Sequence, residues 1–95
     1  MITLQHLIDL LERVIKELRY RYGETYIERI KERRTKYEVH LKVDDRPVKI
    51  IIDKNNIKAR VYTGLPGMEI SIRRIVLREY RKELERIRRE RQESL

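Results

Sequence analysis

The chain has 95 residues, which is enough for one domain and too few for two. It contains no cysteine, which excludes disulfide bonds and thiolate metal sites, and no apolar run approaches the roughly 20 residues of a membrane span. Lysine and arginine number 24 against 16 aspartate and glutamate, and the formal net charge of +8 favours polyanionic partners. The first residues lack the features of a signal peptide, so we expect a soluble cytoplasmic protein.

The first predicted element is a long amphipathic helix. Thr3 suits its N-cap and Gly23 suits its end. Between them, apolar residues recur at every third or fourth position, which predicts one buried stripe. The stripe consists of Leu4, Leu7, Ile8, Leu11, Val14, Ile15, Leu18 and Tyr22. It is broad enough to serve both a sheet and a second copy of the chain, so we predict a homodimer through this N-terminal helix.

The segment that follows has two interpretations. Thr25 and Glu28 form the T-x-x-E pattern of a capping box, which favours a second, short helix over residues 26–34. The rival interpretation is an extra strand, since residues 25–27 have good β propensity. We prefer the helix.

Three strand-length runs rich in β-branched residues come next, at residues 37–43, 48–52 and 57–62. The turns at 44–47 and 53–56 are too short for anything but antiparallel neighbours. With a period of two, one face is purely apolar and the other is mostly basic. The apolar face comprises Tyr37, Val39, Leu41, Val43, Val48, Ile50, Ile52, Ile57, Ala59 and Val61. The other face comprises Glu38, His40, Lys42, Lys49, Ile51, Lys58, Arg60 and Tyr62.

A loop dense in glycine and proline, residues 63–67, leads to the last helix. Residues 68–72 alternate, so they either add a fourth strand or form extended chain before Ser71 as a helix cap. From Arg73 onward the pattern is helical; residues 88–94 are polar all round, and the tail over residues 88–95 is expected to fray. The apolar side of this helix carries Ile72, Ile75, Val76, Tyr80, Leu84 and Ile87.

These elements predict a single small basic α+β domain over residues 1–95. Its fold class is a two-layer sandwich with a long N-terminal helix, a three-stranded or four-stranded antiparallel meander and a C-terminal helix.

Catalytic and metal-binding motifs are missing from the sequence, so we predict a protein that is not an enzyme and needs no cofactor. The helix–meander–helix order resembles the restriction-endonuclease-like fold, which implies a Mg²⁺ site and nuclease activity. Glu28, Asp53 and Lys54 would supply pieces of that site. The third strand, residues 57–60, lacks the E-x-K of the family, so the metal-dependent nuclease is the minor alternative.

The same element order resembles a double-stranded-RNA-binding domain. That family grips phosphates with a basic cluster at the start of its final helix, after a glycine-containing loop. The run from Gly64 to Gly67 followed by Arg73 and Arg74 is similar to that motif. The first helix is far longer than in the family, and the first hairpin is acidic at Asp44 and Asp45. The likeness covers topology and one motif, and we do not assign the chain to the family.

The basic sheet face is the main functional candidate, and the predicted function is non-catalytic nucleic-acid binding. Cations would contact phosphates while an aromatic ring stacks on a base or sugar. The predicted binding residues are Lys42, Lys49, Lys58, Arg60 and Tyr62 on the sheet, with Arg73 and Arg74 on the last helix. Abundant Lys, Arg and Glu is also typical of heat-adapted proteins, in which charges form ion-pair networks, so composition alone does not separate a ligand from thermal adaptation.

A protein-interaction module, such as a small dimeric regulator or an inhibitor from a mobile element, is the competing class. An exposed Ile51, the long stripe of the first helix and the arginine-rich tail fit it, because arginine and tyrosine are favoured at interfaces.

Overall fold

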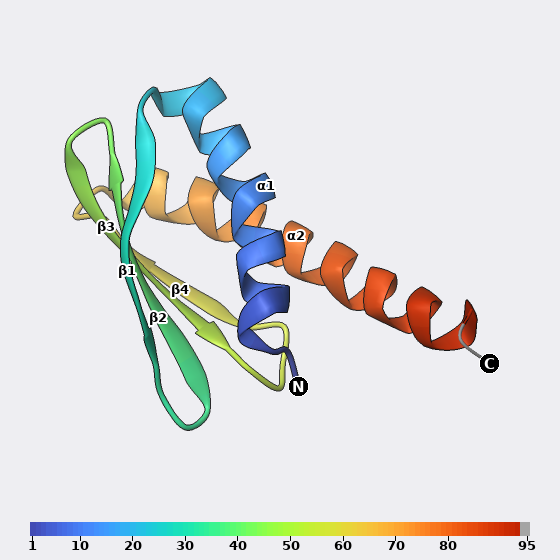
Figure 1. Ribbon diagram of the computed structural model, residues 1–95. Helices are drawn as coiled ribbons and strands as arrows, with labels where there is room; N and C mark the ends of the chain where they lie inside the picture. Colours follow the sequence, from blue (N-terminus) through green and yellow to red (C-terminus); the bar gives the residue numbers. More distant parts are fainter. Residues whose placement is uncertain (94–95) are drawn as a thin grey trace.

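The computed structural model describes residues 1–93 and shows a four-stranded antiparallel sheet with both helices packed on one of its faces (Figure 1). In chain order the elements are α1 (Leu4–Tyr22), β1 (Thr25–Glu32), β2 (Lys36–Val43), β3 (Arg46–Asp53), β4 (Ala59–Tyr62) and α2 (Pro66–Glu93). The predicted α+β class, with a helix at each end of an antiparallel meander, is confirmed in its four-stranded form.

The strands lie in the sheet in the order in which they occur in the chain. A two-residue turn joins β2 and β3, and Asp44 and Asp45 both have positive φ there (49° and 65°), as a type I′ hairpin turn requires. Val39 lies opposite Ile50, which lies opposite Val61. The predicted apolar positions of β2, β3 and β4 therefore align on the face that the helices cover, and all of them are buried.

The predicted helix over residues 26–34 was wrong, because this segment forms β1. β1 contains a bulge. The register with β2 shifts between Ile27 and Arg29, so Ile27 and Ile30, three residues apart, both pack against the core. Thr25 caps no helix and donates its hydroxyl hydrogen bond to the carbonyl oxygen of the preceding glycine at 3.0 Å.

The last helix begins earlier than predicted. α2 starts at Pro66, where a missing N–H costs nothing, so residues 68–72 form neither a strand nor a lead to a cap at Ser71. Glu69 Oε2 accepts hydrogen bonds from the backbone N–H groups of Thr63 (2.7 Å) and Gly64 (3.1 Å) and thereby ties the loop to the first turn.

Two smaller predictions concern the ends of elements. Ile57 was expected on the apolar face, but it lies in the loop before β4 and is 37% exposed. Residues 88–93 belong to α2, while residues 94 and 95 lie outside the described chain. The fraying of this tail stays a prediction.

The core lies between the sheet and the two helices. α1 contributes most of its apolar stripe to it, and its buried residues are Leu7, Leu10, Leu11, Val14, Ile15 and Leu18. Most of the surface that was expected to pair with a second copy is thus used inside one chain, while Ile8 is half-buried and Leu4 is 44% exposed. The homodimer stays a prediction for sedimentation to test.

Charged side chains join the two helices at a buried site, which we call the interhelical charge cluster. Arg13 lies 2.9 Å from a Glu79 carboxylate oxygen through Nε and 3.0 Å from Glu83 through Nη2. Arg86 contacts Glu83 and also lies 2.9 Å from Asp9. Glu83 is fully buried and Glu79 nearly so, so the two arginines neutralise carboxylates that water does not reach.

The electrostatics of this cluster favour the ionised carboxylate. Burial by itself raises the pKa of Glu79, but hydrogen bonds from Arg13, Arg78 and Lys82 outweigh burial and hold that pKa below its ordinary value.

Candidate functional site

The open face is the side of the sheet opposite the helices, and within residues 1–93 no helix or strand covers it (Figure 1). Its side chains are half-buried or exposed, whereas the alternate residues of β2 and β3 are buried. Cross-strand pairing arranges it in rows. The middle row is Arg29, His40, Lys49 and Tyr62. One neighbouring row is Tyr26, Lys42 and Pro47, and the other is Lys31, Glu38, Ile51 and Arg60.

The predicted binding residues fall into three places. Lys42, Lys49, Arg60 and Tyr62 lie on the open face. Lys58 lies in the loop before β4, and Arg73 and Arg74 lie near the start of α2 in the helical layer. The structure brings Lys58, Arg60 and Arg73 to one hollow at the end of the sheet, and Arg74 does not line it.

That hollow, which we call the basic groove, has a volume of about 640 Å³. It is lined by Lys36, Ile51, Asp53, Lys58, Ala59, Arg60 and Arg73. Four of these side chains are cations from three strands or loops and one helix. A phosphate group that entered the groove would meet positive charge on several sides.

Arg73 reaches the basic groove because β4 is an edge strand. Its Nε donates to the carbonyl oxygen of Ala59 at 2.9 Å, a backbone group that has no neighbouring strand to pair with. This bond holds the guanidinium at the rim of the groove, so less side-chain freedom is lost when an anion binds.

Asp53 is the single acid in the basic groove, and its carboxylate is already occupied. Its Oδ1 accepts hydrogen bonds from the backbone N–H groups of Asn55 and Asn56, both at 2.8 Å. These bonds lower the pKa of Asp53 below its ordinary value. Asp53 stays ionised and takes part of the positive charge away from the groove without closing it.

A second, smaller hollow of about 280 Å³ opens on the middle row, with Glu28, His40, Lys49 and Tyr62 among its lining residues. Lys49 Nζ lies 4.8 Å from the centroid of the Tyr62 ring, a cation–π contact that holds the ring beside the ammonium group. Tyr62 is nevertheless 43% exposed. Its ring remains accessible to another flat group.

The predicted cations lack acidic partners. Within residues 1–93, no carboxylate oxygen lies within the 4.0 Å ion-pair distance of any of Lys42, Lys49, Lys58, Arg60, Arg73 or Arg74. Glu38 is the acid in the middle of the open face, and it pairs with His40 (2.8 Å) and Lys31 (3.8 Å). The hydrogen bond with His40 lowers the pKa of Glu38, so this carboxylate subtracts from the field at one position.

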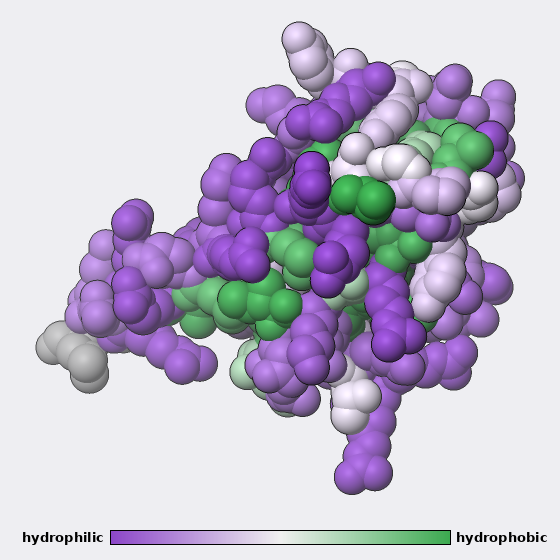
Figure 2. Space-filling model, turned by 180° about the vertical axis from the view of Figure 1, so that it is seen from behind, coloured by the Kyte–Doolittle hydropathy of each residue, from purple (hydrophilic) through white to green (hydrophobic). Residues whose placement is uncertain are grey.

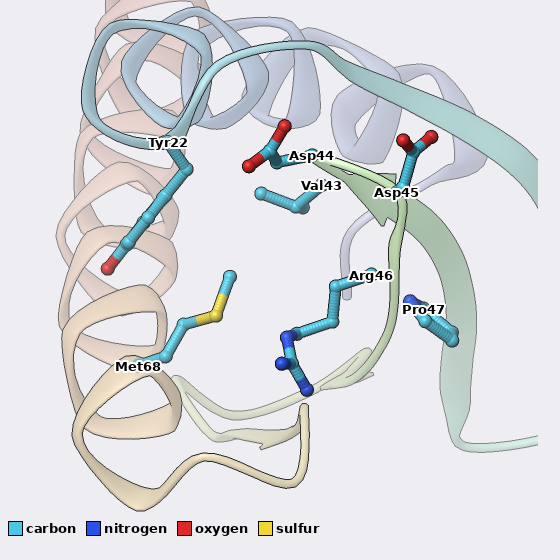
Figure 3. A pocket seen from close by; sticks show the side chains of 7 residues that line it. All are labelled: Tyr22, Val43, Asp44, Asp45, Arg46, Pro47 and Met68. Atoms are coloured by element: carbon cyan, nitrogen blue, oxygen red, sulfur yellow. The ribbon is translucent and has the colours of Figure 1, made fainter.

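A third hollow, of about 490 Å³, lies at the opposite end, between the end of α1, the β2–β3 turn and the start of α2 (Figure 3). The carboxylates of Asp44 and Asp45 and the guanidinium of Arg46 are its charged groups. Arg46 Nη1 donates to the Thr63 carbonyl at 3.1 Å, and in Figure 3 its guanidinium points away from both carboxylates. Within residues 1–93 neither aspartate has an ion-pair partner, and these two negative charges beside one engaged cation disfavour a polyanion here.

The pieces of a nuclease site do not converge. Lys54 is buried, with Nζ 2.8 Å from Glu32 and 4.9 Å from the Tyr37 ring centroid. Glu28 lines the small hollow of the middle row, and Asp53 lines the basic groove. Over the described chain, no three His, Asp or Glu side chains form a group able to hold a metal ion.

The sequence interpretation missed the contribution of β1 and of the start of β2. Tyr26, Arg29 and Lys31 extend the open face by one strand, and Lys36 lines the basic groove. The β propensity of residues 25–27 was the signal that would have found the first three.

Comparison with known proteins leaves the site to be interpreted from its own chemistry. The chain matches no family model, no curated protein and no solved structure. Neither helix, as described over residues 1–93, is both long and apolar enough to cross a membrane.

Proposed function

We propose that this protein binds nucleic acid, without catalysis, through the open face and the basic groove. The observation that supports the proposal is the state of the cations there. Charges between the helices are matched by carboxylates, whereas Lys42, Lys49, Lys58 and Arg60 have no acidic partner within the described residues. Uncompensated cations on a surface that nothing covers attract a polyanion and release its counterions on binding.

In this proposal the two hollows have different tasks. Lys58, Arg60 and Arg73 hold a phosphate in the basic groove, where Arg73 is already anchored by its backbone contact. Lys42 and Lys49 contact further phosphates along the face, and Tyr62 offers a ring to a base or sugar. Arg74 is exposed on α2 outside the groove, so it adds to the long-range field.

The test is a charge-reversal variant, Lys49→Glu with Lys58→Glu and Arg60→Glu. The matched control is Lys16→Glu with Arg81→Glu and Arg89→Glu, which changes net charge by the same amount at exposed helix positions away from the open face. We expect the first variant to lose polynucleotide affinity on the order of 100-fold or more, because it removes direct phosphate contacts. The control loses only the general attraction, a few-fold at moderate salt. Fluorescence anisotropy with labelled DNA and RNA measures both.

Salt dependence provides an independent check. The plot of log affinity against log salt concentration should fall by about 0.7 to 0.9 for each phosphate neutralised. The triple variant should show a slope lower by about two to three. Equal losses in the two variants would mean that net charge, rather than this face, governs binding, and the site would then be wrong.

A protein-interaction module is the second candidate, and one observation favours it. Leu65 and Ile70 are 44% and 54% exposed around the start of α2. Seen from the side opposite to Figure 1, hydrophobic surface also gathers at the base of the projecting end of α2 (Figure 2). Association through such a surface would be insensitive to salt, and an Ile70→Asp change would abolish it.

A further inference from the structure

Two exposed tyrosines stand at opposite sides of the open face. Tyr26 on β1 is 44% exposed and Tyr62 on β4 is 43% exposed. Each is the cross-strand partner of a lysine, Tyr26 of Lys42 and Tyr62 of Lys49. A ring next to a flexible cation offers a stacking surface and a phosphate contact at one place, which is the combination that unpaired nucleotides require.

The tyrosines of the core differ from this pair. Tyr37 and Tyr80 are buried, and their hydroxyl groups donate to the backbone carbonyls of Ile2 (3.4 Å) and Asp53 (2.7 Å). Burial raises the pKa of Tyr80 to about 12. Tyr37 and Tyr80 are therefore enclosed and hydrogen-bonded, whereas Tyr26 and Tyr62 present their rings beside lysines on the open face.

The middle row connects the two sides of the face. Arg29, His40, Lys49 and Tyr62 are consecutive cross-strand partners, so they form a line across all four strands. Glu28, in the bulge of β1, places one carboxylate at the hollow beside this line. Tyr62 and Arg60 are two residues apart on β4 and point to the same side. A base stacked on Tyr62 is therefore followed directly by the basic groove, where the next phosphate would sit.

The width of the sheet argues against a duplex. Four strands at about 4.8 Å spacing separate the outer backbones by about 14 Å, before side chains are added. The major groove of B-form DNA is about 12 Å wide, and that of A-form RNA is too narrow for side chains to read. A duplex would rest on the cations by its backbone alone and leave both tyrosines unused. A single strand can lie flat on the face and use the rings.

We infer that the ligand of the open face is a single strand of nucleic acid that crosses the β-strands from Tyr26 to Tyr62, with bases stacked on both rings. This inference rests on the proposed function and narrows its substrate class. The basic groove then receives a phosphate beyond the Tyr62 position. Single-stranded DNA and RNA share the chemistry that the face recognises, and the probes below separate them.

The test removes the aromatic rings of Tyr26 and Tyr62 while preserving the β-strands that carry them. In Tyr26→Thr with Tyr62→Thr, threonine retains strand propensity. The conservative variant is Tyr26→Phe with Tyr62→Phe, and the matched control is Tyr20→Thr, since Tyr20 is 91% exposed on α1. The probes are fluorescein-labelled DNA and RNA strands of about 12 nucleotides, a length in the range of single-strand sites, and a 12-base-pair duplex of each. Circular dichroism checks that every variant is folded.

We expect the wild-type protein to bind a single strand at least 10-fold more tightly than the duplex. The double threonine variant should lose about 30-fold or more of single-strand affinity, because two bases lose the rings on which they stack. The phenylalanine variant and Tyr20→Thr should bind as wild type, and duplex affinity should not change in any of them. Preference for either the DNA or the RNA strand supports the inference and identifies the sugar.

Failure of the inference differs from failure of the proposed function. Duplex binding as tight as single-strand binding, or unchanged single-strand affinity without the rings, overturns the single-strand inference while the charge-reversal result still stands. Absence of binding to every probe overturns both.

Discussion

The interhelical charge cluster and the open face both contain basic side chains, but those of the cluster are paired with carboxylates and most of those on the face are not. Between the helices, Arg13 and Arg86 are paired with Glu79 and Glu83, and the carboxylates are buried. On the open face, neighbouring cations such as Lys49 have no carboxylate within ion-pair distance in the described chain. Charge is internally balanced where it holds helices together and unbalanced where nothing covers it. The net charge of +8 is shared between helices and sheet, but within residues 1–93 Lys42, Lys49 and Arg60 lie without ion-pair partners on one uncovered face.

The same comparison separates the two explanations of the charged composition, which are thermal adaptation and a ligand. Ion-pair networks of the kind found in heat-adapted proteins account for paired helix charges such as Arg13 and Arg86. Within residues 1–93 these networks do not include Lys42, Lys49 or Arg60 of the strands, and we propose that a ligand neutralises those cations. Changes in the two regions should accordingly affect different measurements: stability for the cluster and binding for the face.

The largest effect on stability is expected at Arg13. In Arg13→Met the aliphatic stem remains but the contacts to Glu79 and Glu83 are lost, so two buried carboxylates keep fewer cations. Because breaking a buried pair strands a charge, we expect the free energy of unfolding to fall by about 2–3 kcal/mol. Urea denaturation measures it, and affinity for polynucleotides in the folded range should be unchanged.

Two companion variants test the reason for that loss. Arg88→Met removes an exposed arginine that is paired with Glu85 and should cost less than about 0.5 kcal/mol. Adding Glu83→Leu to Arg13→Met should restore part of the stability, because an apolar group replaces a buried carboxylate that keeps only Arg86 of its two arginines. If Arg13→Met costs no more than Arg88→Met, the cluster does not stabilise the helix pair.

Acid should weaken the helix pair in a way that depends on Glu79. The hydrogen bonds of this carboxylate hold its folded-state pKa below the ordinary value of 4.5. A lowered pKa means that the unfolded chain binds the proton more readily, so the contribution of Glu79 is complete above about pH 5 and is lost as pH falls through the lowered pKa. Thermal unfolding between pH 7 and pH 3 should show a shallower decline for Glu79→Gln than for the wild type. Parallel curves would contradict this assignment.

The elements that sequence reasoning located have a single regular period. The alternation of β2 and β3 and the stripe of α1 are uninterrupted, so burial follows from position alone. β1 was missed because Thr25 and Glu28 match the capping-box pattern, whereas the Thr25 hydroxyl bonds the Gly23 carbonyl and no helix follows. The start of α2 was misplaced because the bond from Glu69 to the Thr63 backbone closes a loop that has no period to read.

Only part of the candidate site could be predicted from the sequence, because only part of it lies on elements with a regular period. Lys42, Lys49 and Tyr62 share a face by alternation, which sequence shows directly. The meeting of Arg73 with Arg60 depends on an edge carbonyl and on how α2 crosses the sheet, and local pattern contains neither. Tyr26 was not predicted as a site residue, because the segment that forms β1 was predicted to be a helix.

The smallest expected effect is a change in polynucleotide affinity on removing the charge of Glu38. Glu38 is the acid among the cations in the middle of the open face, where His40 and Lys31 contact it. In Glu38→Gln the shape is kept and the negative charge is removed, so Lys31 becomes available to a phosphate and polynucleotide affinity should rise about 2- to 3-fold at low salt, with no gain at high salt. Anisotropy titrations at two salt concentrations measure the change, and Glu12→Gln on the exposed side of α1 is the matched control. A larger rise with the control than with Glu38→Gln would show that the field of the whole protein, and not the local field of the sheet, attracts the ligand.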